Sequence, residues 1–117
     1  MNEPIYTMDE LIYKTRQWFY AKEIIKNSNP LKQLEKTQEE LTETRDAVVR
    51  YECNIGNSDE NQFIEEIKDG IGDTVVTLIG VCEMYGFTLE DCLQQAYDVI
   101  SKRSGKMVNG KFVKDLV

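Results

Sequence analysis

Three glutamates at helical spacing, Glu39, Glu40 and Glu43, lie in the middle of a long polar stretch. On an α-helix, residues three and four positions apart share a face, so Glu39 and Glu40 both lie one turn before Glu43. Carboxylates at this spacing repel one another, and the helix gains from the cluster only where a cation neutralises it. Because the chain has no histidine, the available ligands are hard oxygens, which suit Mg²⁺ or Mn²⁺ rather than zinc.

A second acidic group, Glu66, Asp69 and Asp73, lies within a stretch that is otherwise apolar. A charge in such surroundings is costly to bury unless it is paired or binds a metal. Glu43 lies 13 residues before Gly56, and Asp69 lies 13 residues after it. If two helices pack antiparallel across a turn at Gly56, both acids lie ~20 Å from the turn and are level with each other. A metal held there implies a phosphate-bearing substrate.

Ordinary surface ion pairs are the alternative interpretation of both clusters. Lys36 lies one turn before Glu39 and Glu40. Arg45 and Arg50 follow Glu43 on the same helix, so the glutamates could belong to an ordinary exterior of ion pairs. Two clusters that are level, one of them inside an apolar helix, favour the metal site over a solvated surface.

Apolar residues recurring at intervals of three and four predict the helices that position these clusters. We expect four helices, over residues 7–26, 30–54 and 59–86 and then from residue 88 onward. Their ends are marked by capping boxes at Thr7 with Glu10 and at Thr88 with Asp91, by Asn29 before Pro30, by Asn57 or Ser58, and by Gly86 as a C-cap. The glycine-punctuated residues 104–112 are expected to leave the helix as an extended arm or a short hairpin.

The third helix carries three glycines, Gly70, Gly72 and Gly80, although each lowers helix stability by about 1 kcal/mol relative to alanine. Such a helix is typically buried from several directions, with glycines allowing a neighbour to approach closely. The apolar residues that the second helix is expected to carry at helical spacing are Leu31, Leu34, Leu41, Val48 and Tyr51. We therefore predict an all-α fold: one domain over 1–117, a four-helix bundle completed by homo-oligomerisation, with a C-terminal arm over 103–117.

The amino-acid composition argues against some classes of binding partner. With 117 residues, 21 acidic and 14 basic, the net charge is −7, which argues against nonspecific binding to nucleic acid or to an anionic membrane surface. No apolar run reaches the ~18 residues that a membrane span needs, so we expect a cytoplasmic protein. The three cysteines are odd in number and lack paired spacing, which predicts neither a disulfide framework nor a zinc site.

Three motifs together resemble the MazG-type nucleoside triphosphate pyrophosphohydrolases, in particular their short single-domain phage and bacterial members. The resemblance covers about residues 18–112. The motifs are Lys32-Gln33-x-x-Lys36-x-x-Glu39-Glu40-x-x-Glu43, then Asp69-x-x-Gly72-Asp73, then Ala96-Tyr97-x-x-Ile100-x-x-Arg103-x-Gly105-Lys106, followed by the tail Asn109-Gly110-Lys111-Phe112.

This resemblance implies an all-α, Mg²⁺-dependent enzyme, a dimer or a dimer of dimers, that cleaves a nucleoside triphosphate to the monophosphate and pyrophosphate. It implies Glu40, Glu43 and Asp73 as metal ligands and Glu39 as a ligand or the base that positions water. The family usually has a glutamate three residues before the aspartate of the second motif. This chain has Gly70 there, and Asp69 is the natural substitute.

The remaining expected contacts are with the substrate. Lys36 in the first motif, and Lys102, Arg103 and Lys106 at the end of the fourth helix, are candidates for the phosphates; Ser104 stands where many relatives carry a second basic residue. Cations at a helix C-terminus are also favoured by the helix dipole alone. Trp18 can stack on a base or pack in the core or a subunit interface.

Two other functions remain open. Related all-α families with the same carboxylate arrangement act on narrower substrates, such as dUTP or phosphoribosyl-ATP. In another class, the chain is a catalytically silent helical interaction protein, which Gly70 makes a real alternative.

Overall fold

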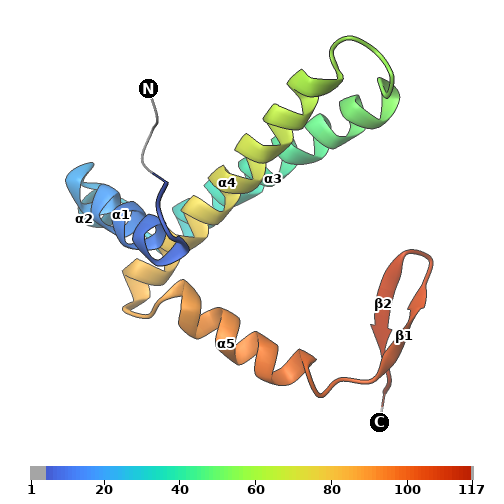
Figure 1. Ribbon diagram of the computed structural model, residues 1–117. Helices are drawn as coiled ribbons and strands as arrows, with labels where there is room; N and C mark the ends of the chain where they lie inside the picture. The colour runs from blue at the N-terminus through green and yellow to red at the C-terminus, as the bar shows by residue number, and fades with distance from the viewer. Residues whose placement is uncertain (1–4, 117) are drawn as a thin grey trace. The chain divides into compact units, whose positions relative to one another are not determined.

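Residues 5–116, the part of the chain described by the computed structural model, form five helices and one two-stranded sheet (Figure 1). The elements are α1 (Met8–Ala21), α2 (Ile24–Asn27), α3 (Pro30–Cys53), α4 (Glu60–Tyr85), α5 (Leu89–Ile100), β1 (Gly105–Val108) and β2 (Lys111–Lys114). The chain divides into two compact units, the first ending at Gly86 and the second beginning at Phe87. The mostly helical class is confirmed. None of the helices within 5–116 has the length and apolar composition of a membrane span.

The first expected helix, over 7–26, is two helices rather than one. Glu23 adopts a left-handed backbone conformation with φ of 60°, which cannot continue a right-handed helix. The chain therefore ends α1 at Ala21 and restarts as the short α2 at Ile24. Neither glycine nor proline marks this break in the sequence, so the single long helix is a wrong prediction that periodicity alone could not correct.

Most of the expected helix ends are confirmed. Thr7 and Thr88 each form a full capping box with the acidic residue three positions later. The side chain of Asn29 caps α3, and Gly86 ends α4 in the left-handed region with φ of 82°. The expected cap of α4 at residues 57–58 is wrong. Its N-cap is Asp59, which makes no capping side-chain hydrogen bond.

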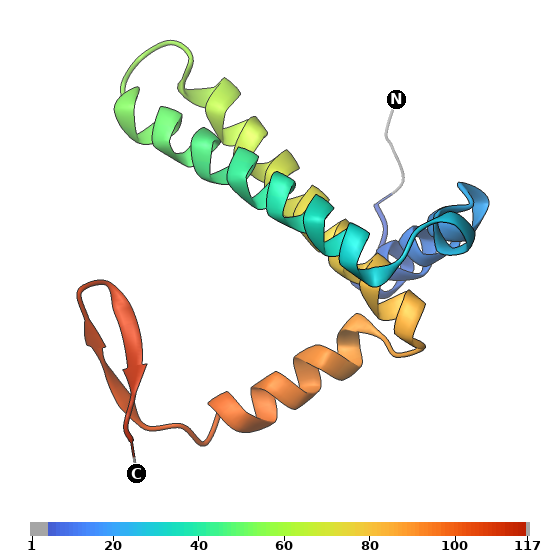
Figure 2. The ribbon, with the colours of Figure 1, turned by 180° about the vertical axis from the view of Figure 1, so that it is seen from behind.

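The helices α3 and α4 run side by side and antiparallel, joined by the turn at residues 54–59 (Figures 1 and 2). The face of α3 toward α4 consists of residues that are buried or half-buried: Gln33, Thr37, Glu40, Thr44 and Ala47. Thr37 and Thr77 share a hydrogen bond of 2.7 Å across this interface. The Thr44 hydroxyl donates to the backbone carbonyl of Glu40 at 2.7 Å. Small side chains with satisfied hydroxyls thus allow the two helices to pack closely.

The leucine stripe of α3 is exposed. Leu31, Leu41 and Val48 are 74%, 55% and 39% accessible to solvent. They repeat at helical spacing on a different face from Thr37, Thr44 and Ala47, and only one face of α3 meets α4. The hydrophobic period therefore identifies a real stripe, but this stripe is not the face of α3 that packs on α4.

Two of the three glycines in α4 are close-approach positions, as expected. A Cβ at Gly70 would collide with the Thr44 side chain of α3, and a Cβ at Gly80 would lie 2.5 Å from the ring of Phe19 in α1. Gly72 faces open space within the described chain. The helix α4 is thus contacted from two directions, by α3 through Gly70 and by α1 through Gly80.

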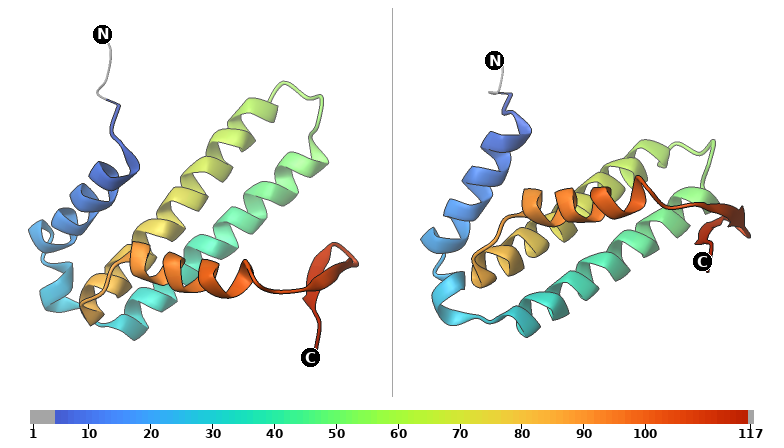
Figure 3. Two further views of the ribbon diagram at one scale, coloured as in Figure 1. Left: turned by 60° about the horizontal axis from the view of Figure 1, so that its bottom comes forward. Right: turned by 90° about the horizontal axis from the view of Figure 1, so that it is seen from below.

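The helix α1 docks near the end of the α3–α4 pair that lies away from the turn, as the two views of Figure 3 show. Its buried residues are Ile12 and Phe19, and the buried residues of α4 at this end include Ile79 and Cys82. An ion pair reinforces the contact: Arg16 Nε donates to Glu83 Oε2 at 2.8 Å.

A pH dependence follows from this ion pair. The hydrogen bond from Arg16 holds the pKa of Glu83 below its ordinary value of 4.5, against the opposing effect of burial. A carboxyl group whose pKa is lowered by folding adds stability that is present above pH ~4.5 and is lost as the pH falls through the folded pKa. We expect the free energy of unfolding of the wild type to decline toward that of Glu83→Gln as the pH falls below about 4.5. Urea unfolding followed by circular dichroism at stepped pH measures this difference, and a gap independent of pH would contradict it.

In the second unit, α5 is followed by an antiparallel hairpin, the second of the two forms expected for the tail. Gly105 pairs with Lys114 and Met107 with Phe112. The turn residues Asn109 and Gly110 have φ of 50° and 80°, which is the geometry of the tightest hairpin turns and explains the Asn-Gly pair.

Candidate functional site

The four carboxylates predicted as metal ligands line one cleft of about 290 Å³ between α3 and α4. We call it the acidic cleft. Its lining residues are Glu40, Glu43, Ala47 and Arg50 from α3 and Glu66, Asp69, Gly70 and Asp73 from α4. The antiparallel packing of α3 on α4 brings Glu43 and Asp69 into the lining of the same cleft, as counting from the turn predicts.

A larger cleft of about 560 Å³ adjoins the acidic cleft and is lined by residues of α1 to α4. We call it the aromatic cleft. Its lining residues are Trp18, Phe19, Ile24, Lys32, Gln33, Glu35, Lys36, Glu39, Glu40, Asp73, Val76 and Thr77. Glu40 and Asp73 line both clefts. The structure thus joins the expected substrate contacts Trp18 and Lys36 to the expected carboxylates through these two shared residues.

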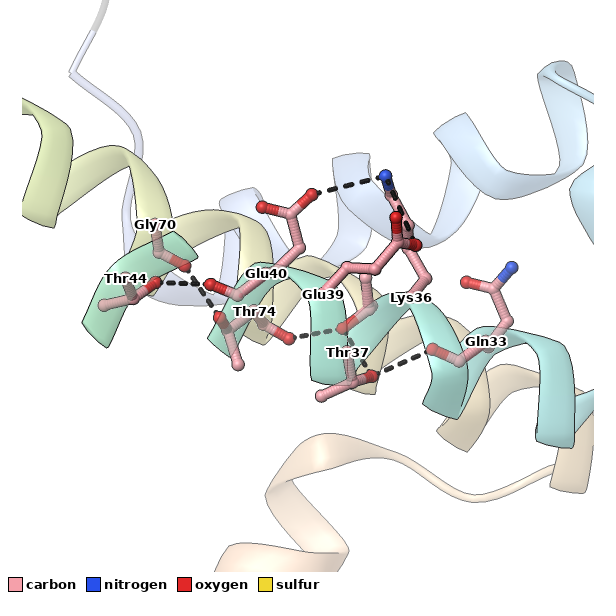
Figure 4. A network of polar contacts seen from close by, with 9 residues as sticks. Gln33, Lys36, Thr37, Glu39, Glu40, Thr44, Gly70 and Thr74 are labelled. Atoms are coloured by element: carbon pink, nitrogen blue, oxygen red, sulfur yellow. Dashed lines mark hydrogen bonds and ion pairs between the residues drawn. The ribbon is translucent and has the colours of Figure 1, made fainter. Parts of the chain in front are cut away.

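Glu40 is the most deeply placed of the carboxylates, with 9% of the residue exposed. Figure 4 shows its side chain and that of Glu39 on the same side of α3 as Lys36. The Lys36 ammonium lies 3.5 Å from Glu40 and 4.0 Å from Glu39. Lys36 is therefore the present countercharge of Glu40, and a metal ion bound by Glu40 would take over that role.

Arg50 is a cleft residue that the sequence interpretation treated only as a possible surface partner of Glu43. In the structure Arg50 Nη2 donates instead to Glu66 Oε2, at 2.9 Å across the α3–α4 pair. It is the one cation among the residues that line the acidic cleft as described. No helical spacing links residues 50 and 66, which lie on either side of the turn, so periodicity gave no signal for this pair.

The metal-ligating side chains that line the acidic cleft are glutamates and aspartates, and their carboxylate oxygens suit a hard divalent cation. Within residues 5–116, however, no group of three acidic or cysteine side chains lies close enough together to hold a metal ion. The expected ligands share a cleft but do not converge. Rotation of the flexible side chains of Glu43, Asp69 and Asp73, together with release of Glu40 by Lys36, is the change that ligation by this set would require.

Gly70 lies beside Asp69 in the lining of the acidic cleft, and its surroundings leave no room for a side chain. A Cβ at residue 70 would lie 3.0 Å from Thr44 Cβ and 3.2 Å from Thr44 Cα, closer still to the hydroxyl. The position belongs to the packed α3–α4 interface as well as to the cleft lining. Asp69 lies one residue earlier, is exposed, and lines the acidic cleft, so it can offer a carboxylate without entering the interface.

The remaining expected substrate residues belong to the second unit, whereas both clefts are lined by the first. Lys102, Arg103 and Lys106 are exposed, and Arg103 lines a groove of about 690 Å³ along α5. Their contact with phosphate stays a prediction.

Comparison with known proteins identifies no family for this chain: no family model, no curated protein and no solved structure matches it.

Proposed function

We propose that this chain is a Mg²⁺-dependent enzyme that hydrolyses nucleoside triphosphates to the monophosphate and pyrophosphate. The observation that carries the proposal is the pair of adjoining clefts, one acidic and one with an aromatic wall, that share Glu40 and Asp73. A nucleoside triphosphate has matching parts, because its phosphates need cations and its base is a flat aromatic ring.

In this proposal the acidic cleft holds the metal ion and the phosphate chain. Glu40, Glu43, Asp69 and Asp73 would hold Mg²⁺, with Mn²⁺ as the chemically similar substitute. Bound Mg²⁺ neutralises phosphate oxygens and makes the phosphorus a better target for water. Glu39, more exposed than Glu40 and next to it on α3, would accept the proton of the attacking water.

In the aromatic cleft, Trp18 would stack on the base and Lys36 would turn from Glu40 to a phosphate once the metal ion neutralises Glu40. Lys102, Arg103 and Lys106 would steady the departing pyrophosphate, which carries several negative charges. The exposed leucine stripe of α3 is the surface on which a second copy of the chain would pack, giving the homodimer or homotetramer.

The test is a survey of products from ATP, GTP, CTP, UTP, their deoxy forms, dUTP and phosphoribosyl-ATP. We expect pyrophosphate and monophosphate in equal amounts from several of these nucleotides, with Mg²⁺ required and EDTA abolishing release. Anion-exchange chromatography of the products separates monophosphate from diphosphate. Release of inorganic phosphate and a diphosphate would contradict the proposal.

The narrower alternative is distinguished by the same survey, because turnover of dUTP or of phosphoribosyl-ATP alone would replace the broad activity. The interaction-protein alternative is favoured by two observations: the carboxylates do not converge, and the α3 leucines are exposed. It predicts no rise in Tm with Mg²⁺ and a nonhydrolysable triphosphate. The enzyme proposal predicts stabilisation of about 2.7 kcal/mol at 100 times Kd.

A further inference from the structure

A cluster of three polar side chains joins α1 to α4 outside both clefts. Arg16 donates two hydrogen bonds to Glu83, from Nε at 2.8 Å and from Nη2 at 3.3 Å. The hydroxyl of Tyr20, one turn after Arg16, donates to the same carboxylate at 3.0 Å. The Glu83 side chain is only 10% exposed. A carboxylate that is mostly buried and accepts three hydrogen bonds fixes the position and direction of the helix that provides the donors.

Phe19 of α1, between Arg16 and Tyr20 in the sequence, is held by apolar packing rather than by hydrogen bonds. Phe19 is 2% exposed and lies directly on Gly80 of α4, where any side chain would displace its ring. Trp18 packs edge-on against Phe19, with ring centroids 5.2 Å apart and planes at 82°. The position of the Trp18 indole therefore depends on how α1 sits on α4.

Trp18 reaches the aromatic cleft from a different element than the carboxylates do. It is 45% exposed and lines the cleft together with Glu40 and Asp73, which α3 and α4 provide. Only Ile12 and Phe19 are buried on α1 within the described chain. The Arg16–Glu83–Tyr20 cluster is the polar contact that adds direction to this apolar packing, so it can fix the distance between the indole and the carboxylates.

We propose that Arg16, Glu83 and Tyr20 are positioning residues that hold Trp18 at the wall of the aromatic cleft and so determine the affinity for the flat base of the substrate. This inference depends on the proposed function for its substrate, but its structural part concerns the free protein. It separates two tasks: the α3–α4 carboxylates govern the reaction at phosphorus, and the α1 cluster governs binding of the base.

The experiment compares Glu83→Gln with Glu65→Gln, a matched change on α4 at an exposed ion pair with Lys68. Trp18 is the one tryptophan of the chain, so its fluorescence reports the α1 position directly. We expect Glu83→Gln to increase quenching of Trp18 by acrylamide in the free protein. We also expect it to raise the KM for the nucleotide about tenfold, with kcat within about twofold, since stacking of one base contributes a factor of this order.

Two further variants should weaken the cluster by smaller amounts. Arg16→Lys keeps the charge but not the two-pronged hydrogen bonding, and Tyr20→Phe removes a single hydroxyl, so both should give smaller rises in KM. Glu65→Gln should change neither the quenching nor the KM. Should Glu83→Gln fail to fold, as judged by circular dichroism, Tyr20→Phe carries the same test.

The inference is overturned if Glu83→Gln folds with unchanged Trp18 quenching, or if it lowers kcat as much as it raises KM. Failure of the proposed function gives a different result. The wild type would then not hydrolyse a triphosphate, and adding a triphosphate would not change the fluorescence of Trp18. Increased acrylamide quenching in Glu83→Gln would in that case still support the positioning role and leave only the ligand wrong.

Discussion

Asp73→Asn is expected to reduce turnover of a nucleoside triphosphate about a thousandfold or more while leaving the helical content unchanged. The amide keeps the shape of the side chain but removes the charge that would hold Mg²⁺, and such metal catalysis contributes several kcal/mol to a phosphoryl reaction. Glu40→Gln should have the same effect, because Glu40 and Asp73 are the two acids that line both clefts. Pyrophosphate release under saturating Mg²⁺, with circular dichroism of each variant, measures both quantities.

Matched controls separate this effect from a general loss of charge. Asp46→Asn and Glu52→Gln remove one exposed carboxylate each from α3, outside the residues that line either cleft. Both should retain turnover within about twofold, since solvent and salt screen exposed charges that do not line the clefts. If Asp73→Asn or Glu40→Gln keeps a near-normal rate with Mg²⁺, the metal assignment is wrong.

Local signals predicted the ends of the helices better than their interiors. The capping boxes at Thr7 and Thr88, and the glycine at residue 86, use side-chain and backbone chemistry that lies within a few residues. The break at Glu23 has no such signal, because a glutamate in the left-handed region is held there by its surroundings rather than by its own preference.

The face of α3 that packs on α4 could not be predicted from the spacing of apolar residues. It is built from threonine, alanine and a glutamate, which pack against α4 because they are small or already paired, whereas the leucines lie elsewhere. Spacing identifies which residues share a face, but a single sequence does not say which of two faces the neighbouring helix covers.

The acidic cleft was predictable because counting along two helices from one turn places residues at the same height. The Arg16–Glu83 pair was not, since 67 positions separate its members and only the docking of α1 brings them together. Contacts between elements that are distant in sequence depend on the packing direction, which local pattern does not encode.

Gly70→Glu is the second change expected to have a large effect, because it places a charged side chain in the packed α3–α4 interface. We expect it to destabilise the fold by about 3 kcal/mol or more rather than to improve the proposed metal site. Filling a packed interface costs about 1–3 kcal/mol, and placing a charge in it adds to that. Thr44 has no room to give way, because its Cα as well as its side chain would be in contact with the new Cβ. Urea unfolding gives the free energy difference.

Gly72→Glu is the matched control, since it introduces the same side chain two residues later on the same helix at a position facing open space. It should leave stability unchanged or raise it by up to about 1 kcal/mol through better helix propensity. Adding Thr44→Ala to Gly70→Glu should recover part of the lost stability, because the two residues are in contact and couple. If Gly70→Glu were instead as stable as Gly72→Glu and bound Mg²⁺ more tightly, residue 70 would be an accessible ligand position. The close packing of α3 on α4 at Thr44 would then not exclude a carboxylate ligand at residue 70.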